Sequence, residues 1–177
     1  MDQLSGVRFF RDQRVTFSIL FVFGIFLSIY AALLPANAML HWFDIDDGFF
    51  YFKVARNFNQ GLGLTFDGIN RTNGFHPLWM AVCVILYRIF PSDLILPLRV
   101  LVILAGVINA LSGILLYRVL SRVLQQWVSF IIAGLWVTWP AIYKVTTTQG
   151  METGLSLLLL LWPVSYTHLT LPTKRIV

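Results

Sequence analysis

The chain has 177 residues, of which 58% are hydrophobic and 12% are charged, and this composition excludes an ordinary soluble globular domain. Its formal net charge is +5, but the basic residues stand singly or in pairs beside apolar runs, so nucleic acid is not an expected partner. A single cysteine, Cys83, excludes an intrachain disulfide. The sequence predicts an all-α polytopic membrane protein.

The N-terminal region predicts a first membrane span. Three arginines precede the apolar run 15–34, which is long enough as a helix to cross about 30 Å of hydrocarbon. Basic residues at the start of a span favour the cytoplasmic side. We therefore expect a cytoplasmic N-terminus and a large loop on the outer face over residues 35–96.

An amphipathic helix is expected near the start of this loop, over residues 46–60. Phe50, Val54 and Phe58 recur at helical spacing and predict an apolar face. The polar residues gather on the other side, namely Asp46, Lys53, Arg56, Asn57 and Gln60. Such a helix is expected to lie on the membrane surface.

Short-range signals define the ends of this segment. Asp44 or Asp46 can cap the first turn of the helix, and Gly61 or Gly63 can end it with a positive φ. Further on, the pair at positions 67 and 68, Asp-Gly, favours a tight hairpin turn.

The apolar run 77–90 leaves two topologies open. As a helix it measures roughly 21 Å, which is short for a span and typical of an interfacial segment. If it stays on the outer surface, the linker between the longer runs 97–120 and 127–143 is cytoplasmic, and the segment 144–153 returns to the outer face. If it spans, that segment is cytoplasmic. The basic residues of the linker, Arg118 and Arg122, favour the surface arrangement.

The C-terminal region predicts an interrupted helix. An apolar run begins at residue 154 and stops near 162, well short of a span. Residues 164–177 lose the membrane character and resemble a translated sequencing adaptor. We expect residues 1–163 to be a truncated membrane module and residues 164–177 to be a non-native tail.

Acidic residues next to a membrane are the strongest functional signal. Ionised carboxylates there need water, a partner or a cation, and Asp46 and Asp47 stand together where a membrane enzyme would keep its chemistry. Glu152 is the only glutamate of the chain. A purely structural role is the alternative for all three, because acidic residues stabilise helix N-termini.

Three stretches, DDGFFYFKVARNFNQGLGLTFDG, TNGFHPLW and GMETG, resemble the N-terminal half of GT-C fold membrane glycosyltransferases. That superfamily includes protein O-mannosyltransferases and lipid A aminoarabinose transferases, and the resemblance covers most of residues 10–163. It implies a GT-C transmembrane module whose large first outer loop bears two juxtamembrane helices. It also implies inverting transfer of a sugar from a polyprenyl-phosphate donor to a lipid, glycan or protein acceptor, at the periplasmic face of a bacterial inner membrane.

Within that resemblance, Asp46 and Glu152 match the acidic residues of the family's outer loops. Asp46 is expected to be the general base, and Asp47 and Glu152 are expected to orient the site. Asp46 and Glu152 are also candidate ligands for Mg²⁺ or Mn²⁺, since carboxylate oxygens suit these cations and some family members need a metal.

Four nearby groups are candidates for binding the donor phosphate: Lys53, Arg56, Arg71 and His76. The alternative for Lys53 and Arg56 is snorkelling from an interfacial helix, and the alternative for His76 is a turn ahead of Pro77.

Two other functional classes compete with the glycosyltransferase. A transporter would place ionisable residues inside its spans, yet residues 15–34, 101–117 and 128–142 contain no Asp, Glu, Lys or Arg. A non-catalytic membrane subunit would not need clustered acidic residues, and mutating them would leave its partner's activity intact.

Overall fold

A computed structural model describes residues 13–43 and 46–170 of the protein. Its elements, in chain order, are α2 (Gln13–Leu33), α3 (Ala36–Leu40), α4 (Asp46–Asn59), α5 (Pro77–Ile89), α6 (Leu96–Leu120), α7 (Gln126–Thr138), α8 (Pro140–Tyr143), the π-helical turn η1 (Lys144–Thr148) and α9 (Thr153–Thr170). In these residues no strand forms, and pairing is limited to an isolated antiparallel bridge between Thr65 and Arg71. The prediction of an all-α protein is confirmed.

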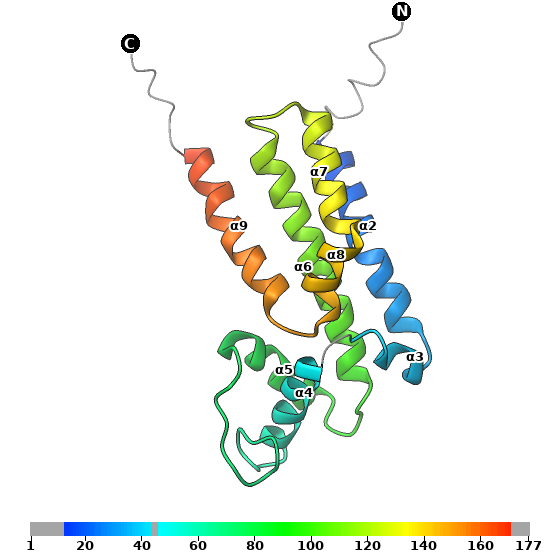
Figure 1. The fold of residues 1–177 in the computed structure, drawn as a ribbon, viewed down its shortest axis with the longest axis vertical. Coiled ribbons are helices and arrows are strands. Elements are labelled where there is room, and N and C mark those ends of the chain that lie inside the picture. The colour runs from blue at the N-terminus through cyan, green and yellow to red at the C-terminus, as the bar shows by residue number, and fades with distance from the viewer. Residues whose placement is uncertain (1–12, 44–45, 171–177) are drawn as a thin grey trace, which may run out of the picture.

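The long helices form a bundle, and the short helices gather at one of its ends (Figure 1). α2 and α6 are long and apolar enough to cross a membrane, and the bent pair formed by α7 and the residues up to Thr148 can supply a third crossing. This arrangement indicates a membrane protein. α4 and α5 lie at the end of the bundle where α9 begins, whereas the linker between α6 and α7 lies at the other end, near the start of α2 (Figure 1).

Small residues let α2 and α6 approach closely. A Cβ added to Gly24 would lie 2.7 Å from the Cα of Ala110, and one added to Gly106 would lie 2.5 Å from the Cβ of Ser28. In both helices the two small residues are four positions apart, the spacing that brings membrane helices into backbone contact. The α2–α6 pair is therefore the tightly packed centre of the bundle.

The run 127–143, expected as one helix, is broken at Pro140. The residue before a proline is driven out of the α-helical region, and Trp139 is extended with φ −66° and ψ 123°. α7 therefore ends at Thr138, and the following helical segment is bent from it by 52°. The amide of Asn109 in α6 donates to Val137 O at 3.3 Å and satisfies a carbonyl at the break.

The segment after this break, expected as a loop over residues 144–153, is mostly helical. Three consecutive threonine hydroxyls in η1 donate to carbonyls four residues earlier, with Thr146 bonding Ile142 O at 2.9 Å and Thr147 bonding Tyr143 O at 2.5 Å. Such back-bonding loosens helix geometry, in keeping with the π-helical turn. The true connection to α9 is the short segment 149–152.

α4 has nearly the predicted bounds, but its predicted polar face is wrong at one position. Asn57, expected on the polar face, is buried and donates to Thr65 O and Phe66 O at 2.9 and 3.0 Å. Phe58, expected on the apolar face, is 44% exposed. The loop that follows α4 folds back on the helix, and its carbonyls need a donor there.

The expected end of α4 forms, whereas Asp67 and Gly68 stand in a wider loop, residues 66–70, instead of the expected tight hairpin turn. Gly61 and Gly63 have φ of 82° and 72°. In this loop, Asp67 Oδ1 accepts the backbone N–H groups of Ile69 and Asn70, and Gly68 has φ 84°. The pairing on either side of it reduces to the single Thr65–Arg71 bridge. Asp44, the other expected cap of α4, lies outside the described residues.

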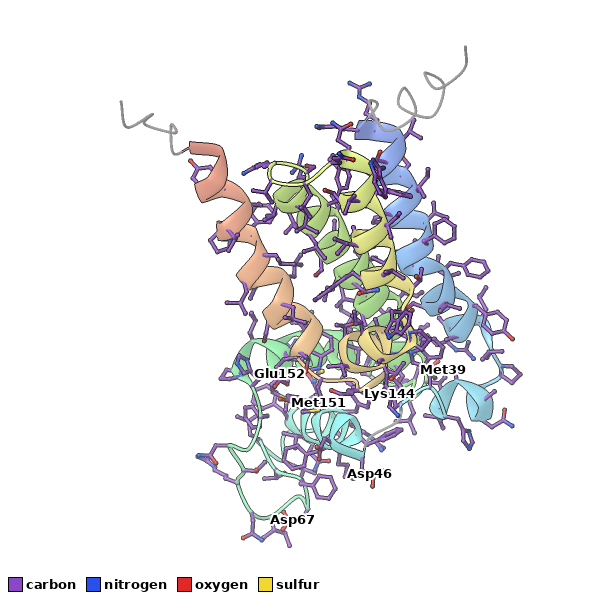
Figure 2. All side chains as sticks on the ribbon, turned by 45° about the horizontal axis from the view of Figure 1, so that its top comes forward. Met39, Asp46, Asp67, Lys144, Met151 and Glu152 are labelled. Carbon is purple, nitrogen blue, oxygen red and sulfur yellow. The ribbon has the colours of Figure 1, made fainter. Side chains whose placement is uncertain are left out.

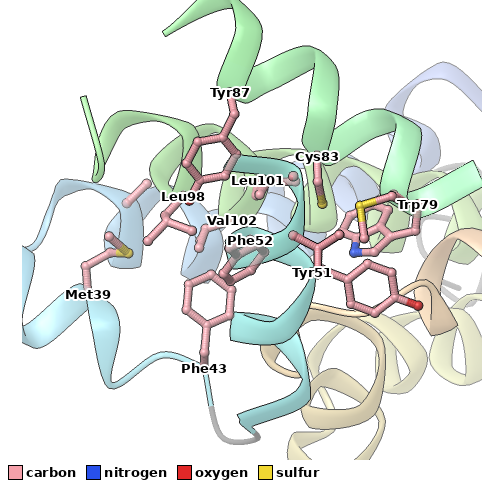
Figure 3. Packing of buried hydrophobic residues seen from close by; sticks show 14 of the residues in the cluster. Met39, Phe43, Tyr51, Phe52, Trp79, Cys83, Tyr87, Leu98, Leu101 and Val102 are labelled. Carbon is pink, nitrogen blue, oxygen red and sulfur yellow. The ribbon is translucent and has the colours of Figure 1, made fainter. Parts of the chain in front are cut away.

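α5 rests on a core that it shares with α3, α4 and α6 (Figure 3). Its buried side chains include Trp79 and Cys83, and the cysteine is fully buried as a packing residue. With 13 residues, α5 is shorter than the helices that can cross a membrane. Its position at one end of the bundle agrees with the surface arrangement preferred from the sequence.

α9 continues through Pro163 to Thr170, so the expected boundary between residues 163 and 164 falls inside a helix. Ser165 is buried, and its hydroxyl donates to Trp162 O at 2.8 Å. The non-native origin of residues 164–177 stays a prediction.

Candidate functional site

An open cavity of about 630 Å³ lies where α4, the start of α5 and the start of α9 meet. Figure 2 shows Met151 and Glu152 at this junction. The volume falls within the range of small-molecule sites, roughly 300–1,000 Å³. The lining residues are Asp47, Phe50, Tyr51, Gly74, Phe75, His76, Pro77, Met151 and Glu152.

A close backbone approach places Glu152 beside α4. A Cβ added to Gly48 would lie 2.6 Å from Gln149 O, so only glycine lets this turn of α4 rest on the segment 149–152. Gly150 adopts φ +66°, and a Cβ there would meet the rings of Phe43 and Phe52 at 3.0 and 3.1 Å. Two glycines far apart in sequence thus fix one contact.

A hydrogen bond from α5 secures the same segment. Trp79 Nε1 donates to Gly150 O at 2.8 Å, and both residues are buried. The indole is part of the core shown in Figure 3, so the position of the segment is tied to the packing of α5. A buried indole N–H needs such a partner, because leaving it unpaired costs free energy.

The hydroxyl of Tyr51 on α4 makes hydrogen bonds both to the start of α5 and to the segment before α9. It donates to Glu152 Oε2 at 2.8 Å and accepts the backbone N–H of His76 at 2.7 Å. Burial, together with the hydrogen bond to Glu152, raises the pKa of Tyr51 to about 12, against the lowering effect of the His76 N–H. Tyr51 is therefore a neutral hydrogen-bond donor to the carboxylate at any physiological pH.

Three helix N-termini converge on this cavity. Asp47 lies in the first turn of α4, His76 and Pro77 begin α5, and Glu152 directly precedes α9. Each helix N-terminus carries a partial positive charge of about half an elementary charge from its unpaired N–H groups. Such termini stabilise ionised carboxylates and also attract phosphate groups.

The two neighbouring aspartates are placed differently. Both are exposed, but Asp47 lines the cavity with Glu152, whereas Asp46, the expected base, is not among the lining residues. Successive residues on a helix point about 100° apart, so only one of two adjacent side chains can face a given cavity. The structure thus brings Asp47, Glu152 and His76 together and leaves Asp46 outside.

The candidate phosphate-binding residues are divided in the same way. His76 lines the cavity, but Lys53 and Arg56 line a separate groove of about 290 Å³. Arg71 is exposed in the loop, where it forms the bridge with Thr65. Among the described residues that line the main cavity there is no lysine or arginine.

A divalent cation was expected between Asp46 and Glu152. Over residues 13–43 and 46–170, no group of three or more His, Cys, Asp and Glu side chains is placed to hold a metal ion. Mg²⁺ often takes most of its ligands from substrate phosphates and water and needs only one or two carboxylates. Asp47 and Glu152 are the pair that shares the cavity, and metal dependence stays a prediction.

Sequence analysis missed four residues that build the site: Gly48, Tyr51, Trp79 and Gly150. Tyr51 stands in the aromatic run FFYF, where nothing distinguishes a hydrogen-bonding tyrosine from a packing ring. The glycines gave a weak signal, since Gly48 interrupts the start of one helix and Gly150 lies three positions before the start of another. Their partners are about a hundred positions away, and no local pattern identifies them.

Comparison of the chain with protein-family models, curated proteins and solved structures finds no match in any of the three. The functional argument therefore depends on the residues and geometry of the cavity.

Proposed function

We propose that the protein is a membrane glycosyltransferase of the inverting type, which uses a polyprenyl-phosphate sugar as donor. The observation that supports this proposal is the cavity at one end of the membrane bundle, where two carboxylates and an imidazole meet three helix N-termini. We place this end on the outer face of a bacterial inner membrane, as the basic linker between α6 and α7 favours.

The chemistry of the transfer matches these groups. The oxygen of an acceptor hydroxyl attacks the anomeric carbon, its proton passes to a carboxylate, and the bond from that carbon to the phosphate oxygen breaks. The electron pair leaves with the polyprenyl phosphate, whose negative charge needs positive groups nearby. Within the cavity, Asp47 or Glu152 supplies the base, the helix N-termini supply partial positive charge, and the imidazole of His76 can donate a hydrogen bond to the phosphate.

Asp47 is the better candidate for the base. The Oε2 atom of Glu152 already accepts the Tyr51 hydroxyl, so this oxygen is occupied and the carboxylate is held in place. Asp47 lines the cavity, and its carboxylate forms no ion pair or side-chain hydrogen bond with another described residue. We therefore transfer to Asp47 the role that the sequence alone favoured for Asp46, and assign Glu152 to orienting the site.

A non-catalytic membrane subunit is the second candidate, because one observation favours it. Glu152 is held by Tyr51 and its segment by Trp79, so the carboxylate also fastens α9 to the surface helices. In such a subunit, removing the charge of Asp47 would leave both the fold and all ligand binding unchanged.

The test compares Asp47→Asn, Asp46→Asn and Glu152→Gln in two assays. The 177-residue chain in lipid nanodiscs is tested for binding of a polyprenyl-phosphate sugar. Transfer of a radiolabelled sugar to an acceptor is measured in membranes that contain the protein. Asp67→Asn, a carboxylate change in a loop outside the cavity, is the matched control.

We expect Asp47→Asn to keep its fold and to lower transfer by a factor on the order of 10² or more, as loss of a general base does. The loss in Asp46→Asn should be smaller. A larger loss in Asp46→Asn would return the base role to Asp46. No donor binding by the wild type, or equal transfer by Asp47→Asn, Glu152→Gln and Asp67→Asn, would exclude a glycosyltransferase site in this cavity.

A further inference from the structure

A second groove runs along the side of α4 that faces away from the carboxylate cavity. Its α4 residues are Phe49, Phe52, Lys53 and Arg56, whereas the cavity uses Asp47, Phe50 and Tyr51. With 3.6 residues per turn, these two sets point in opposite directions from the helix axis. A ligand in this groove is therefore separated from Asp47 and Glu152 by the body of the helix.

The groove combines an apolar floor with two cations. Aromatic and leucine side chains, among them Phe52, Tyr87 and Leu98, are buried beneath it, and Leu94 on its wall is 50% exposed. Lys53 and Arg56 supply the charge, and neither forms an ion pair with an acidic residue in the part of the chain that the structure describes. The chemistry is complementary to an acyl chain joined to a phosphate.

A smaller pocket continues the groove and adds hydrogen-bonding groups. It shares Arg56, Tyr87 and Leu94 with the groove and is also lined by Asn59 and Gln60. We call the two together the α4 lipid groove. Apolar surface, cations and amide groups thus follow one another along α4, in the order of the tail, phosphate and polar head of a lipid.

Asn59 leaves a buried acceptor unused in this pocket. Its Nδ2 donates to Ala55 O and Val84 O, both at 2.9 Å, which fixes the orientation of the amide. Its Oδ1 is buried and has no hydrogen-bond donor among the described residues. A buried acceptor without a partner is costly, and a ligand hydroxyl that displaced its covering atoms would remove this cost.

These features identify the occupant as a lipid of the bilayer. α4 lies at one end of the helices that are long and apolar enough to cross a membrane, and lipid head groups are expected at that level. A polyprenyl-phosphate donor bound here would hold its sugar on the wrong side of α4 for Asp47 and Glu152. A bilayer phospholipid has no such requirement, and it is present in excess.

We propose that the α4 lipid groove binds an anionic bilayer phospholipid whose phosphate contacts Lys53 and Arg56 and whose hydroxylated head group bonds Asn59. Phosphatidylglycerol has this chemistry. The site would be independent of the sugar-transfer proposal and would fix α4 to the membrane surface.

The test is a titration of the purified chain with phosphatidylglycerol, followed by native mass spectrometry, with phosphatidylcholine as the zwitterionic comparison. The key variant is Lys53→Gln with Arg56→Gln. Its control is Arg88→Gln with Arg122→Gln, which removes the same charge from exposed positions outside the groove. A second variant, Leu94→Trp, fills the groove without a change in charge, and Leu124→Trp is its control.

We expect the Lys53/Arg56 double variant to lose phosphatidylglycerol affinity by roughly tenfold or more, from the usual contribution of basic residues near anionic lipid. Leu94→Trp should lose affinity as well, while both controls and Asp47→Asn retain it. Equal losses in the key variant and its control would show general surface attraction and overturn the proposal. Preferential binding of a polyprenyl phosphate in the same groove would also overturn the proposal, and would show that the groove binds the sugar donor instead.

Discussion

The hydroxyl of Tyr51 donates a hydrogen bond of 2.8 Å to Glu152 Oε2, and so joins α4 to the segment that begins α9. The two residues are 101 positions apart in the chain. The acceptor is a carboxylate, and hydrogen bonds to charged groups contribute about 1.5–3 kcal/mol, more than neutral ones. This bond is therefore the most direct point at which to test the structure of the cavity.

We predict that Tyr51→Phe lowers the free energy of unfolding by about 1–3 kcal/mol, because both Glu152 and the His76 N–H lose a partner. Hydrogen exchange should quicken in residues 74–78 and 149–152. Unfolding in mixed micelles measures the first effect. Tyr30→Phe is the control, since Tyr30 is 59% exposed, and a similar loss in both variants would contradict the role of the bond.

The same tyrosine predicts a loss of stability at alkaline pH. The pKa of Tyr51 is raised in the folded state from 10.0 to about 12, mainly by burial. The folded protein therefore holds this proton more tightly than the unfolded chain does. The contribution of the protonated Tyr51 to the free energy of unfolding is complete below about pH 10 and is lost as pH rises towards 12.

The measurement is the free energy of unfolding as a function of pH in the wild type and in Tyr51→Phe. Burial also raises the pKa of Tyr87 and Cys83, so both proteins should lose stability in alkali. The wild type should lose more stability than Tyr51→Phe, and the difference between the two curves measures the effect of ionising Tyr51. Parallel curves would show that Tyr51 ionises equally easily in both states.

Labelling of single cysteines in intact cells should place positions 46 and 152 on the same side of the membrane. The start of α4 and the start of α9 lie at one end of the bundle, and the Arg122 linker lies at the other (Figure 1). In a Cys83→Ser background, an impermeant thiol reagent should label Asp46→Cys and Glu152→Cys but not Arg122→Cys. Opposite results at 46 and 152 would rule out the surface placement of α5.

Replacing Gly106 with alanine should weaken the α2–α6 pair. The new Cβ would lie 2.5 Å from the Cβ of Ser28, and relieving such a clash in a packed core costs typically 1–3 kcal/mol. Gly134→Ala is a close control, because a Cβ there meets nothing within 4 Å. Steric-trap unfolding in bicelles measures both variants, and equal stabilities would show that the helices separate without cost.

Local patterns predicted most of the helices but not which residues meet. The apolar runs that form α2 and α6 and the glycines that end α4 could be read from the sequence, because these signals act over a few residues. The break before Pro140 was not predicted, although proline restricts the residue before it and the sequence contains that signal. The apolar composition of the run favoured one continuous helix instead.

The choice between Asp46 and Asp47 could not be made from sequence. It depends on the rotation of α4 about its axis, which is set by the contact of Gly48 with Gln149 and by Trp79. The same rotation sends Lys53 and Arg56 into the α4 lipid groove. A rotation of about 100° would exchange Asp46 and Asp47 at the cavity, and only tertiary packing fixes the rotation.

The bonds that Tyr51 and Trp79 make with residues 149–152 have a consequence for the order of assembly during synthesis. Trp79 precedes Gly150 by 71 positions and Tyr51 precedes Glu152 by 101, so α4 and α5 reach the membrane surface long before their partners are made. Until then the indole N–H and the phenol must be hydrated or paired elsewhere. Translation of residues 149–152 therefore converts two separate surface helices into one enclosed site, and the cavity is among the last parts of this region to form.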